Sequence, residues 1–471
     1  MAEPIREPLR AAVAAILAAS LLLSPGVPAA AGAGEGVDFP AAVDAALRNN
    51  ARVSAAGFEA QAAREDARSA RGLYLPRLTF EEKFVRTNVP AEAFALKLNE
   101  ERLAASDFAD VRNFNEAPPI NDYIATITLE QPLFAPKAWL GRGITDRESR
   151  AREFDLARRK EEVVYQVLSA YLDLMTAKEF REVAERGLSD AREHHRIAER
   201  KERNGVGLVS DLLRAKVFLA RAESEQVTAE NRVVLARTAL GLAMGEPGGT
   251  EVDAVAPVPP LPERGVLEER IDALRKERTD LRAFSLRLEN AGEQVTFEKA
   301  GYLPAVGVSG AYQIDGQDGP FSPDNRTWRV GVGLSWTLFD GLRREAAVAK
   351  AVAGRSGTRE HLRGASDRAA FEVTQAWLGV EESTRRLAIA RAAVDAAEEG
   401  ARLVQARYEN QLARMIDLLD AQTALNGARA DRARAENDLQ HSRARLEAAS
   451  GTLLSWALAA GRQSDGKGSE R

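Results

Sequence analysis

The amino-acid sequence predicts a mainly helical protein with a small β component, built from one duplicated unit. Three observations support this fold class. Long tracts are rich in Ala, Arg and Glu, which form helices well, and aromatic residues make up only 6% of the chain. Short segments of alternating apolar and small polar residues interrupt these tracts, as strands do. The segments follow the same order in both halves of the 471 residues.

Composition excludes two classes of function. The formal net charge is -5, from 65 basic and 70 acidic residues that are spread along the chain, so no basic face of the kind that binds nucleic acid is expected. The chain has no Cys, which excludes disulfides and thiolate metal sites. We expect no nucleic-acid partner and no cofactor.

The first 33 residues have the pattern of a secretory signal. Arg6 and Arg10 precede an apolar run over 11–23, and prolines and small residues follow the run. The alternative is a membrane anchor, but the run is shorter than the roughly 20 residues that a spanning helix needs. We therefore expect a signal peptide over 1–33 that is cleaved.

The rest of the chain contains an internal repeat. Four pairs of similar segments occur in the same order: 74–76 with 302–304 (offset 228), 133–134 with 338–339 (offset 205), 165–174 with 371–380 and 210–223 with 416–429 (both offset 206). Because the offset falls from 228 to 205 between the two strands of each repeat, the first interstrand loop is longer than the second. Such a loop is expected to project into solvent.

The first repeat is expected over 34–246 and the second over 265–457. The expected elements of the first are a helix over 40–72, strands over 74–87 and 122–134, a long helix over 137–203 and a helix over 209–246. Those of the second are a helix over 265–298, strands over 302–313 and 328–339, a long helix over 342–409 and a helix over 414–457. A Pro-rich, extended linker over 247–264 joins the repeats, and the tail over 458–471 is expected to be disordered.

Helix and strand periodicity justify these elements. No proline interrupts either long helix, and apolar residues such as Val164, Val167 and Tyr171 recur at helical spacing. At 1.5 Å per residue, each long helix is about 100 Å long. The shorter helices of each repeat sum to about the same length when they are stacked end to end.

The strand over 328–339 has one apolar face and one small, polar face. Its apolar positions are Trp328, Val330, Val332, Leu334 and Trp336. A half-buried strand over a soluble core and a strand of a membrane barrel both show this alternation. In a bilayer, four strands per chain would leave unpaired edges and fall short of the eight that a minimal barrel needs. Only oligomerisation would close such a barrel.

These segments are where the chain resembles a known family, the TolC-like outer-membrane efflux channels of Gram-negative bacteria. The resemblance covers nearly all of the chain after the signal and lies in the duplication together with "LYLPRL", "QPLF", "SDLLRA", "YLPAVGV", "LSWTLFDG" and "IDLLDAQTAL". It implies a homotrimer whose 12 strands form one transmembrane barrel, continued by a 12-helix barrel through the periplasm.

The resemblance also implies partners and a function. The expected partners are a periplasmic adaptor protein, an inner-membrane transporter of the RND or ABC type, and outer-membrane lipid. The chain would be the exit duct of a tripartite efflux pump or a type I secretion system, located in the outer membrane with a large periplasmic part. The five apolar positions of the strand over 328–339 would then face lipid.

In this family the turn of the second hairpin closes the periplasmic end. Matching "YENQLARMIDLLDAQT" places Asp417 and Asp420 at the carboxylates that ring the constriction, and Tyr408 at a residue that ties the closed tip together. Residues three apart share a helix face, so three chains would place six carboxylates around one axis. The alternative is two solvated helix acids without a gating role.

The link that closes the tip departs from the family pattern. Where the pattern has Arg five residues after the Tyr, this chain has Ala413, and Arg414 follows one position later. Ser210 and Asp211 match the partners of that link. The alternative is that Ser210 and Asp211 are only the N-cap of the next helix.

The sequence disfavours two other classes of protein. An enzyme is not expected, because the four His residues lack metal-site spacing and no nucleophile or nucleotide-binding motif frames the Ser, Asp or Gly residues. A soluble periplasmic coiled-coil or adaptor-type protein should carry one hairpin flanked by β-rich segments. The duplication with four alternating strands argues against it.

Overall fold

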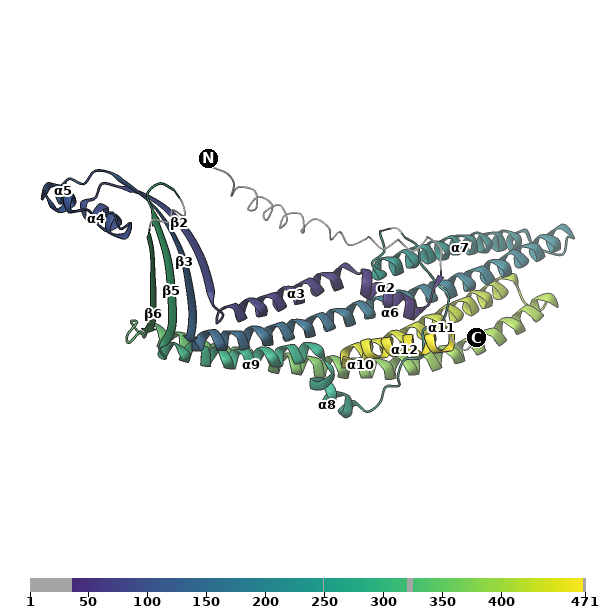
Figure 1. Ribbon diagram of the computed structural model, residues 1–471. Helices are drawn as coiled ribbons and strands as arrows, with labels where there is room; N and C mark the ends of the chain where they lie inside the picture. The colour runs from purple at the N-terminus through teal and green to yellow at the C-terminus, as the bar shows by residue number, and fades with distance from the viewer. Residues whose placement is uncertain (1–35, 249, 320–324, 469–471) are drawn as a thin grey trace.

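The computed structural model describes residues 36–248, 250–319 and 325–468. The expected signal peptide lies outside them. The molecule is long and narrow, with a β-sheet at one end, two helical turns at the other, and helices running between them (Figure 1). No helix in the described part of the chain is long and apolar enough to cross a membrane.

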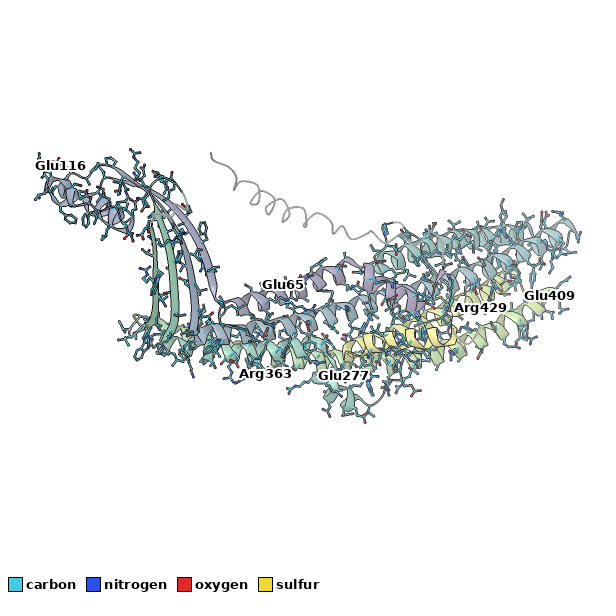
Figure 2. All side chains as sticks on the ribbon, viewed as in Figure 1. Glu65, Glu116, Glu277, Arg363, Glu409 and Arg429 are labelled. Carbon is cyan, nitrogen blue, oxygen red and sulfur yellow. The ribbon has the colours of Figure 1, made fainter. Side chains whose placement is uncertain are left out.

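Two long helices run along the whole helical part of the molecule. They are α6 (Pro136–Arg203) and α10 (Arg343–Glu409), with 68 and 67 residues. Pro136 occupies the start of α6, where its missing N–H leaves no hydrogen bond unmade. At 1.5 Å per residue each helix is about 100 Å long, as expected from the sequence. Charged side chains project along both rods, from the sheet end to Glu409 at the tip (Figure 2).

The shorter helices pack along the long ones in stacked pairs. Along α6 lie α3 (Ala51–Gly72) and α7 (Val209–Met244); along α10 lie α9 (Thr279–Lys299) and α11 (Met415–Ser450). Glycines end α7 and α11 at the two junctions. Gly245 has φ 86°, and a Cβ there would lie 2.7 Å from the carbonyl carbon of Asn49. Gly451 has φ 81°, and its Cβ would lie 2.9 Å from Cα of Arg278. The stacking therefore requires glycine at both junctions.

Two helices that were expected to be continuous are broken. The segment expected over 40–72 is α2 (Phe39–Asn49) followed by α3, and the segment expected over 265–298 is α8 (Leu267–Glu277) followed by α9. Asn50 and Arg278 take extended conformations at the breaks. Asn50 caps α3 by accepting a hydrogen bond from the backbone N–H of Arg52, and its side chain donates to the carbonyl of Ala243 in α7. The break thus forms where the stacked helix meets its partner.

The expectation of a disordered tail over 458–471 is wrong as far as residue 468. The helix expected over 414–457 ends at Ser450, and a separate helix, α12 (Leu453–Gly468), follows Gly451. Leu453 and Ala457 are buried, and the Trp456 ring lies 5.5 Å from that of Phe39 in α2. Apolar packing against α2 and α6 therefore stabilises the start of this helix, which continues into the polar residues after 457.

Four strands form one antiparallel sheet in the order β2–β3–β5–β6. Their bounds are β2 (Arg77–Thr87), β3 (Ile120–Phe134), β5 (Ala305–Gly316) and β6 (Asn325–Ser335). Each strand begins or ends two to four residues away from its expected bounds. Trp336 thus lies just beyond β6. The pairing of β3 with β5 joins the two repeats, and β2 and β6 are the edges.

The register gives the whole sheet one apolar face. Directly paired residues point to the same side, and Trp328 pairs with Tyr312, which pairs with Ile127, which pairs with Phe80. The alternate rows point to the opposite face, which is small and polar in β5 and β6, for example Gly331 opposite Ser309, and carries charge in β2 and β3, for example Arg77 opposite Glu130. The apolar face expected in β6 therefore extends across all four strands.

The first interstrand segment is longer, as expected, but it is not a plain loop. It holds α4 (Pro90–Asn99), the 3₁₀ helix η1 (Ala105–Phe108) and the short α5 (Arg112–Asn115). Ala93 and Leu96 of α4 pack with Ile120 at the start of β3 in a small apolar cluster. The insert lies beyond the sheet at the far end of the molecule (Figure 1).

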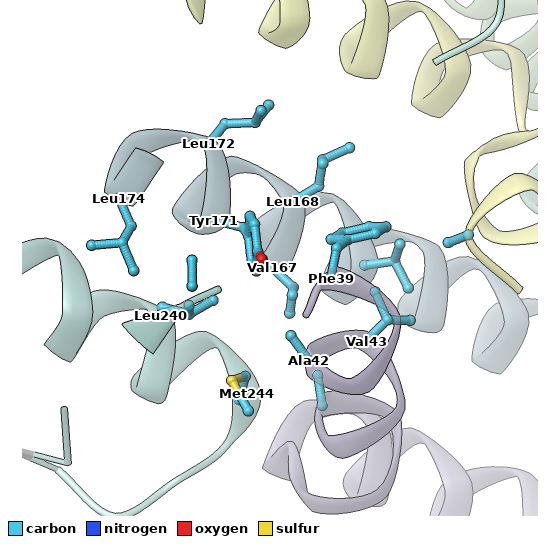
Figure 3. Packing of buried hydrophobic residues seen from close by; sticks show 14 of the residues in the cluster. Phe39, Ala42, Val43, Val167, Leu168, Tyr171, Leu172, Leu174, Leu240 and Met244 are labelled. Atoms are coloured by element: carbon cyan, nitrogen blue, oxygen red, sulfur yellow. The ribbon is translucent and has the colours of Figure 1, made fainter. Parts of the chain in front are cut away.

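The largest apolar cluster of the described residues lies where α2 packs on α6, between the two ends of the molecule (Figure 1), and Figure 3 shows its packing from close by. Phe39 and Tyr171 meet edge to face there, with ring centroids 5.9 Å apart. The hydroxyl of Tyr171 donates to the carbonyl of Ala256 at 2.6 Å, which holds the linker against α6. The linker also contains β4 (Asp253–Ala254), which pairs in parallel with β1 (Gly36–Val37).

The two repeats use the same hydrogen bond where the sheet meets the helices. Gln131 Nε2 donates to the carbonyl of Tyr74 at 2.9 Å, and Trp336 Nε1 donates to the carbonyl of Tyr302 at 3.0 Å. The donors and the acceptors occupy corresponding positions of the two repeats. In each repeat the bond ties the end of the second strand to the segment that leads from a helix into the first strand.

Candidate functional site at the helical tip

Two helical turns form the end of the molecule opposite to the sheet (Figure 1). Residues 204–208 join α6 to α7, and residues 410–414 join α10 to α11. Each turn contains a left-handed residue: Gly205 with φ 71° and Gln411 with φ 65°. Glycine takes this conformation without steric cost, whereas glutamine does not. The turn of the second hairpin is therefore the more strained of the two.

An apolar cluster packs the two hairpins together at the tip. Its buried members come from all four helices: Ala198, Ala215, Tyr408, Met415, Leu418 and Leu419. Met415 and Leu418, on the first turn of α11, are almost fully buried. Separating the second hairpin from the first would expose this cluster to water, at a free-energy cost proportional to the apolar area. The arrangement is therefore a packed, closed tip within the chain.

Asp417 is engaged at the start of α11. Its Oδ2 accepts from the backbone N–H of Arg414 at 3.0 Å, and its Oδ1 accepts from Arg414 Nη2 at 3.0 Å. The hydrogen bond from the Arg414 side chain, followed by that from its backbone N–H, holds the pKa of Asp417 below its ordinary value. Asp417 thus stays ionised and caps the helix, and its charge is balanced by Arg414.

Asp420 is the freer of the two predicted gate carboxylates. It lies one turn further along α11, on the same face as Asp417, and its side chain is exposed. Within the described residues it has no ion-pair partner. Of the two, Asp420 is the carboxylate whose charge is not balanced inside its own chain.

Arg414 contacts Asp417, and within the chain it contacts neither Ser210 nor Asp211. The link from the second hairpin to Ser210 and Asp211 therefore stays a prediction. The alternative, that these two residues are the N-cap of α7, is wrong: Leu208 holds the N-cap position, and the helix has begun at Val209. Asp211 lies in the first turn, where a carboxylate interacts favourably with the helix dipole.

Tyr408 joins the two hairpins, but by an interaction that sequence reasoning did not predict. Its side chain is buried, and Lys201 Nζ lies 3.9 Å from the centroid of its ring. Lys201 Nζ also donates to the main-chain carbonyl of Tyr408 at 3.3 Å. Burial, followed by the negative charge of Asp211, raises the pKa of the Tyr408 hydroxyl. Lys201, Asp211 and Tyr408 are thus neighbours at the tip.

A seam between α6 and α11 continues above the tip. Gln422 Nε2 donates to Asp190 Oδ2 at 2.7 Å, and a Cβ on Gly187 would lie 3.0 Å from Asn426 Nδ2. His194 is 95% buried beside this seam, and among the described residues neither ring nitrogen has a hydrogen-bond partner. Burial lowers the pKa of His194, against the opposing effects of the charges of Asp190 and Glu193 and of the nearby side chain of Gln422. We therefore treat His194 as neutral in this conformation.

One sequence signal could have revealed the seam. Gly187, Ala191, His194 and Ala198 are all buried and are spaced by four, three and four residues, and Lys201 follows after three more. Such spacing places residues on one helix face that packs against a second helix. The charged residues between them hide the pattern.

At the opposite pole, the five positions predicted to face lipid are exposed in the single chain. The exposed fractions are 76% for Trp328, 66% for Val330, 72% for Val332, 65% for Leu334 and 55% for Trp336. They share the apolar face of the sheet, apart from Trp336, which follows the strand. So large an apolar surface marks an interaction site.

The described residues contain no group of three His, Asp or Glu side chains that could hold a metal ion. His441 Nε2 lies 3.1 Å from Asp173 Oδ1 and joins α11 to α6.

Comparison with known proteins supports a single family. The profile of the family "Outer membrane efflux protein" matches residues 42–246 and 271–452, which are the two repeats. Among curated relatives, the alkaline protease secretion protein AprF of Pseudomonas aeruginosa is 24% identical over 421 residues, which cover 87% of this chain and 83% of AprF. The outer membrane protein OprJ of the same species is 24% identical, over 48% of each chain.

Solved structures show the same fold. The Campylobacter jejuni CmeC outer membrane channel matches with a TM-score of 0.73 at 17% identity, over 88% of this chain and 86% of CmeC. The outer membrane protein VceC of Vibrio cholerae matches with a TM-score of 0.72 at 19% identity, over 88% of this chain and 96% of VceC.

Proposed function

The chain belongs to the outer membrane efflux protein family and is an outer-membrane channel, and we propose that the turn of its second hairpin is the periplasmic gate. Members of this family are conduits and not enzymes. Located in the outer membrane of a Gram-negative bacterium, the channel is the exit duct of a tripartite efflux pump or type I secretion system. Its partners are a periplasmic adaptor and an inner-membrane transporter.

The edges of the sheet support a trimeric barrel. β2 and β6 have no neighbour within the described chain on their outer sides, and unpaired amides are not tolerated in hydrocarbon. Three copies give 12 strands, which is enough to close a barrel with a bore, whereas four strands are not. The apolar face that contains Val330, Val332 and Leu334 would then contact lipid, and the small, polar face would line the water-filled bore.

Native mass measurement in detergent tests this assembly. A trimer is the expected species. A detergent-solubilised monomer that kept its full helix and strand content would contradict the closure argument.

The observation that supports the gate is the position of Asp420. It is exposed at the tip, one turn from the start of α11, and has no ion-pair partner among the described residues. Three copies around one axis would form a ring of carboxylates, and such rings select for cations. Asp417 contributes less charge, because Arg414 is paired with it. This differs from the expectation that both carboxylates ring the constriction equally.

The gate is tested by ion selectivity in planar bilayers. Asp420→Asn should shift the selectivity of the purified channel from cations towards neutral and weaken block by multivalent cations from the periplasmic side. Asp395→Asn, which removes an exposed carboxylate from α10 further from the tip, should change neither property. An unaltered reversal potential and blocking constant in Asp420→Asn would contradict the gate assignment. The conclusion that the protein is a channel would still stand.

The second candidate function, a soluble coiled-coil or adaptor-type protein, is not supported. Both halves of the chain match the channel family, and each half carries its own strand pair and helical hairpin.

A further inference from the structure

Lys201 makes an unusual set of contacts for a surface lysine. It lies in the last turn of α6, and both partners of its ammonium group belong to Tyr408, in the last turn of α10. The nitrogen lies 3.9 Å from the ring centroid and 3.3 Å from the main-chain carbonyl oxygen. Within the described residues, no carboxylate forms an ion pair with it. The ammonium group of Lys201, in the first hairpin, is therefore held by a single residue of the second hairpin.

Both halves of this contact are favourable for a cation. The face of an aromatic ring carries partial negative charge and attracts an ammonium group within about 6 Å. The Tyr408 carbonyl is one of the last of α10, which ends at Glu409, and the C-terminal end of a helix is the negative end of its dipole. Lys201 thus caps the helix of the other hairpin while it covers the ring.

The ring itself is held in place by packing. Tyr408 is buried in the apolar cluster with Met415 and Leu418, so its face is presented to Lys201 in one orientation. Its hydroxyl has no hydrogen bond within the described residues. The ring face and the carbonyl, rather than the hydroxyl, make the contact between hairpins.

We propose that Lys201 and Tyr408 form a clasp that keeps the tip of each chain closed, through the ring face and the main-chain carbonyl. The clasp rests on the proposed function of the tip as a gate. Ala413 carries no charge, and Arg414 is already paired with Asp417 within the chain. Lys201 therefore supplies the positive charge that holds the tip closed. For the second hairpin to move away from the first, the ammonium group must leave the ring and return to water.

Opening by this route is reversible and requires little free energy. Water solvates a free ammonium group well, so the open state leaves no buried charge unpaired. The strength of cation–π contacts corresponds to a closed-to-open ratio about two- to thirty-fold larger per clasp. A trimer has three clasps, so partial loss should already increase leakage.

Currents through single channels in planar bilayers test the clasp with two pairs of variants. Lys201→Met removes the charge and keeps most of the side-chain volume, and Tyr408→Leu removes the ring and keeps the carbonyl; both should raise the open fraction by about two- to thirty-fold per chain. Tyr408→Phe keeps the ring face and should stay as closed as the unmodified channel. Lys216→Met, which removes an exposed lysine of α7 near the tip, is the charge-matched control and should leave the currents unchanged.

The outcomes distinguish a clasp made by the ring face from a closure made by the hydroxyl. Leakage in Tyr408→Phe equal to that in Tyr408→Leu would show that the hydroxyl closes the tip, and it would overturn the proposal. Unchanged currents in Lys201→Met would overturn it as well. Native mass measurement of every variant ensures that trimers are compared. If Tyr408→Leu does not assemble into a trimer, the currents of Lys201→Met test the clasp. The gate assignment is judged separately, by the ion selectivity of Asp420→Asn.

Discussion

His194 illustrates how one buried residue can make the stability of the tip depend on pH. The side chain is buried beside the seam of α6 and α11 without a hydrogen-bond partner among the described residues, and burial lowers its pKa in the folded protein. Above the ordinary value of about 6.5, the residue is neutral in both the folded and the unfolded chain and contributes no pH dependence. As the pH falls through that value, the unfolded chain binds a proton that the folded chain does not, so stability is lost.

We expect His194→Leu to reduce this loss. The free energy of unfolding between pH 7.5 and 5.5 should fall less in the variant, and at pH 7.5 the variant should be as stable as the original or more stable by about 1 kcal/mol, because two unpartnered nitrogens are removed. Thermal unfolding of the detergent-solubilised trimer at both pH values measures this. His361→Leu, at an exposed position of α10, is the control. An unchanged pH dependence in His194→Leu would show that the histidine is protonated or solvated in the folded state.

At this scale, sequence reasoning predicted residues whose role depends on local spacing and missed those whose role depends on a partner from the other hairpin. Asp417 and Asp420 were found by their match to the family motif, and their spacing of three residues places them on one helix face. That Asp417 pairs with Arg414 follows from the capping pattern at the start of α11, which the sequence also contains. Lys201 resembles any other solvated lysine until α10 is placed beside α6.

Among the elements, the stacked helices depend on glycine at their junctions. Gly451 is left-handed and touches the backbone of Arg278, so Gly451→Ala should lower the free energy of unfolding by about 2 kcal/mol or more, from the positive φ together with the steric overlap. Gly427→Ala, within α11 and with open space around it, should instead raise it by about 0.5–1 kcal/mol. Chemical or thermal denaturation followed by helical circular dichroism measures both changes. Equal effects at the two positions would refute the junction argument.

The same elements show what periodicity can predict. The two long helices and the four strands were found within a few residues, because their patterns are long or strictly alternating. The breaks at Asn50 and Arg278 were missed, since they lie where two helices meet end to end and the apolar pattern continues across them. Helix α12 was missed because its stability comes from Trp456 and Leu453 packing onto α2, and not from the polar residues that follow.

For the whole molecule, the duplication places the two hairpin turns at one end and the two strand pairs at the other. The repeats differ most in the insert between β2 and β3, which carries α4 and α5 and lies beyond the sheet. Glu116 lies at this far end, and Glu409 lies at the tip (Figure 2). We expect the first end to face outwards from the outer membrane and the second to face the periplasm. The polarity of the whole molecule can therefore be tested with two insertions.

An epitope tag inserted after Glu116 should be bound by antibody on intact cells and leave export working, because the residue is exposed in the insert and lies outside the strand pairing. The same tag inserted after Gly205 should be reached only after the outer membrane is permeabilised. It should also abolish export, since this turn lies at the tip and its left-handed glycine sets a sharp reversal between α6 and α7. Native mass measurement should give a trimer for both variants. Labelling of the Gly205 insertion on intact cells would invert the orientation of the molecule, and with it the assignment of Asp420 to a periplasmic gate.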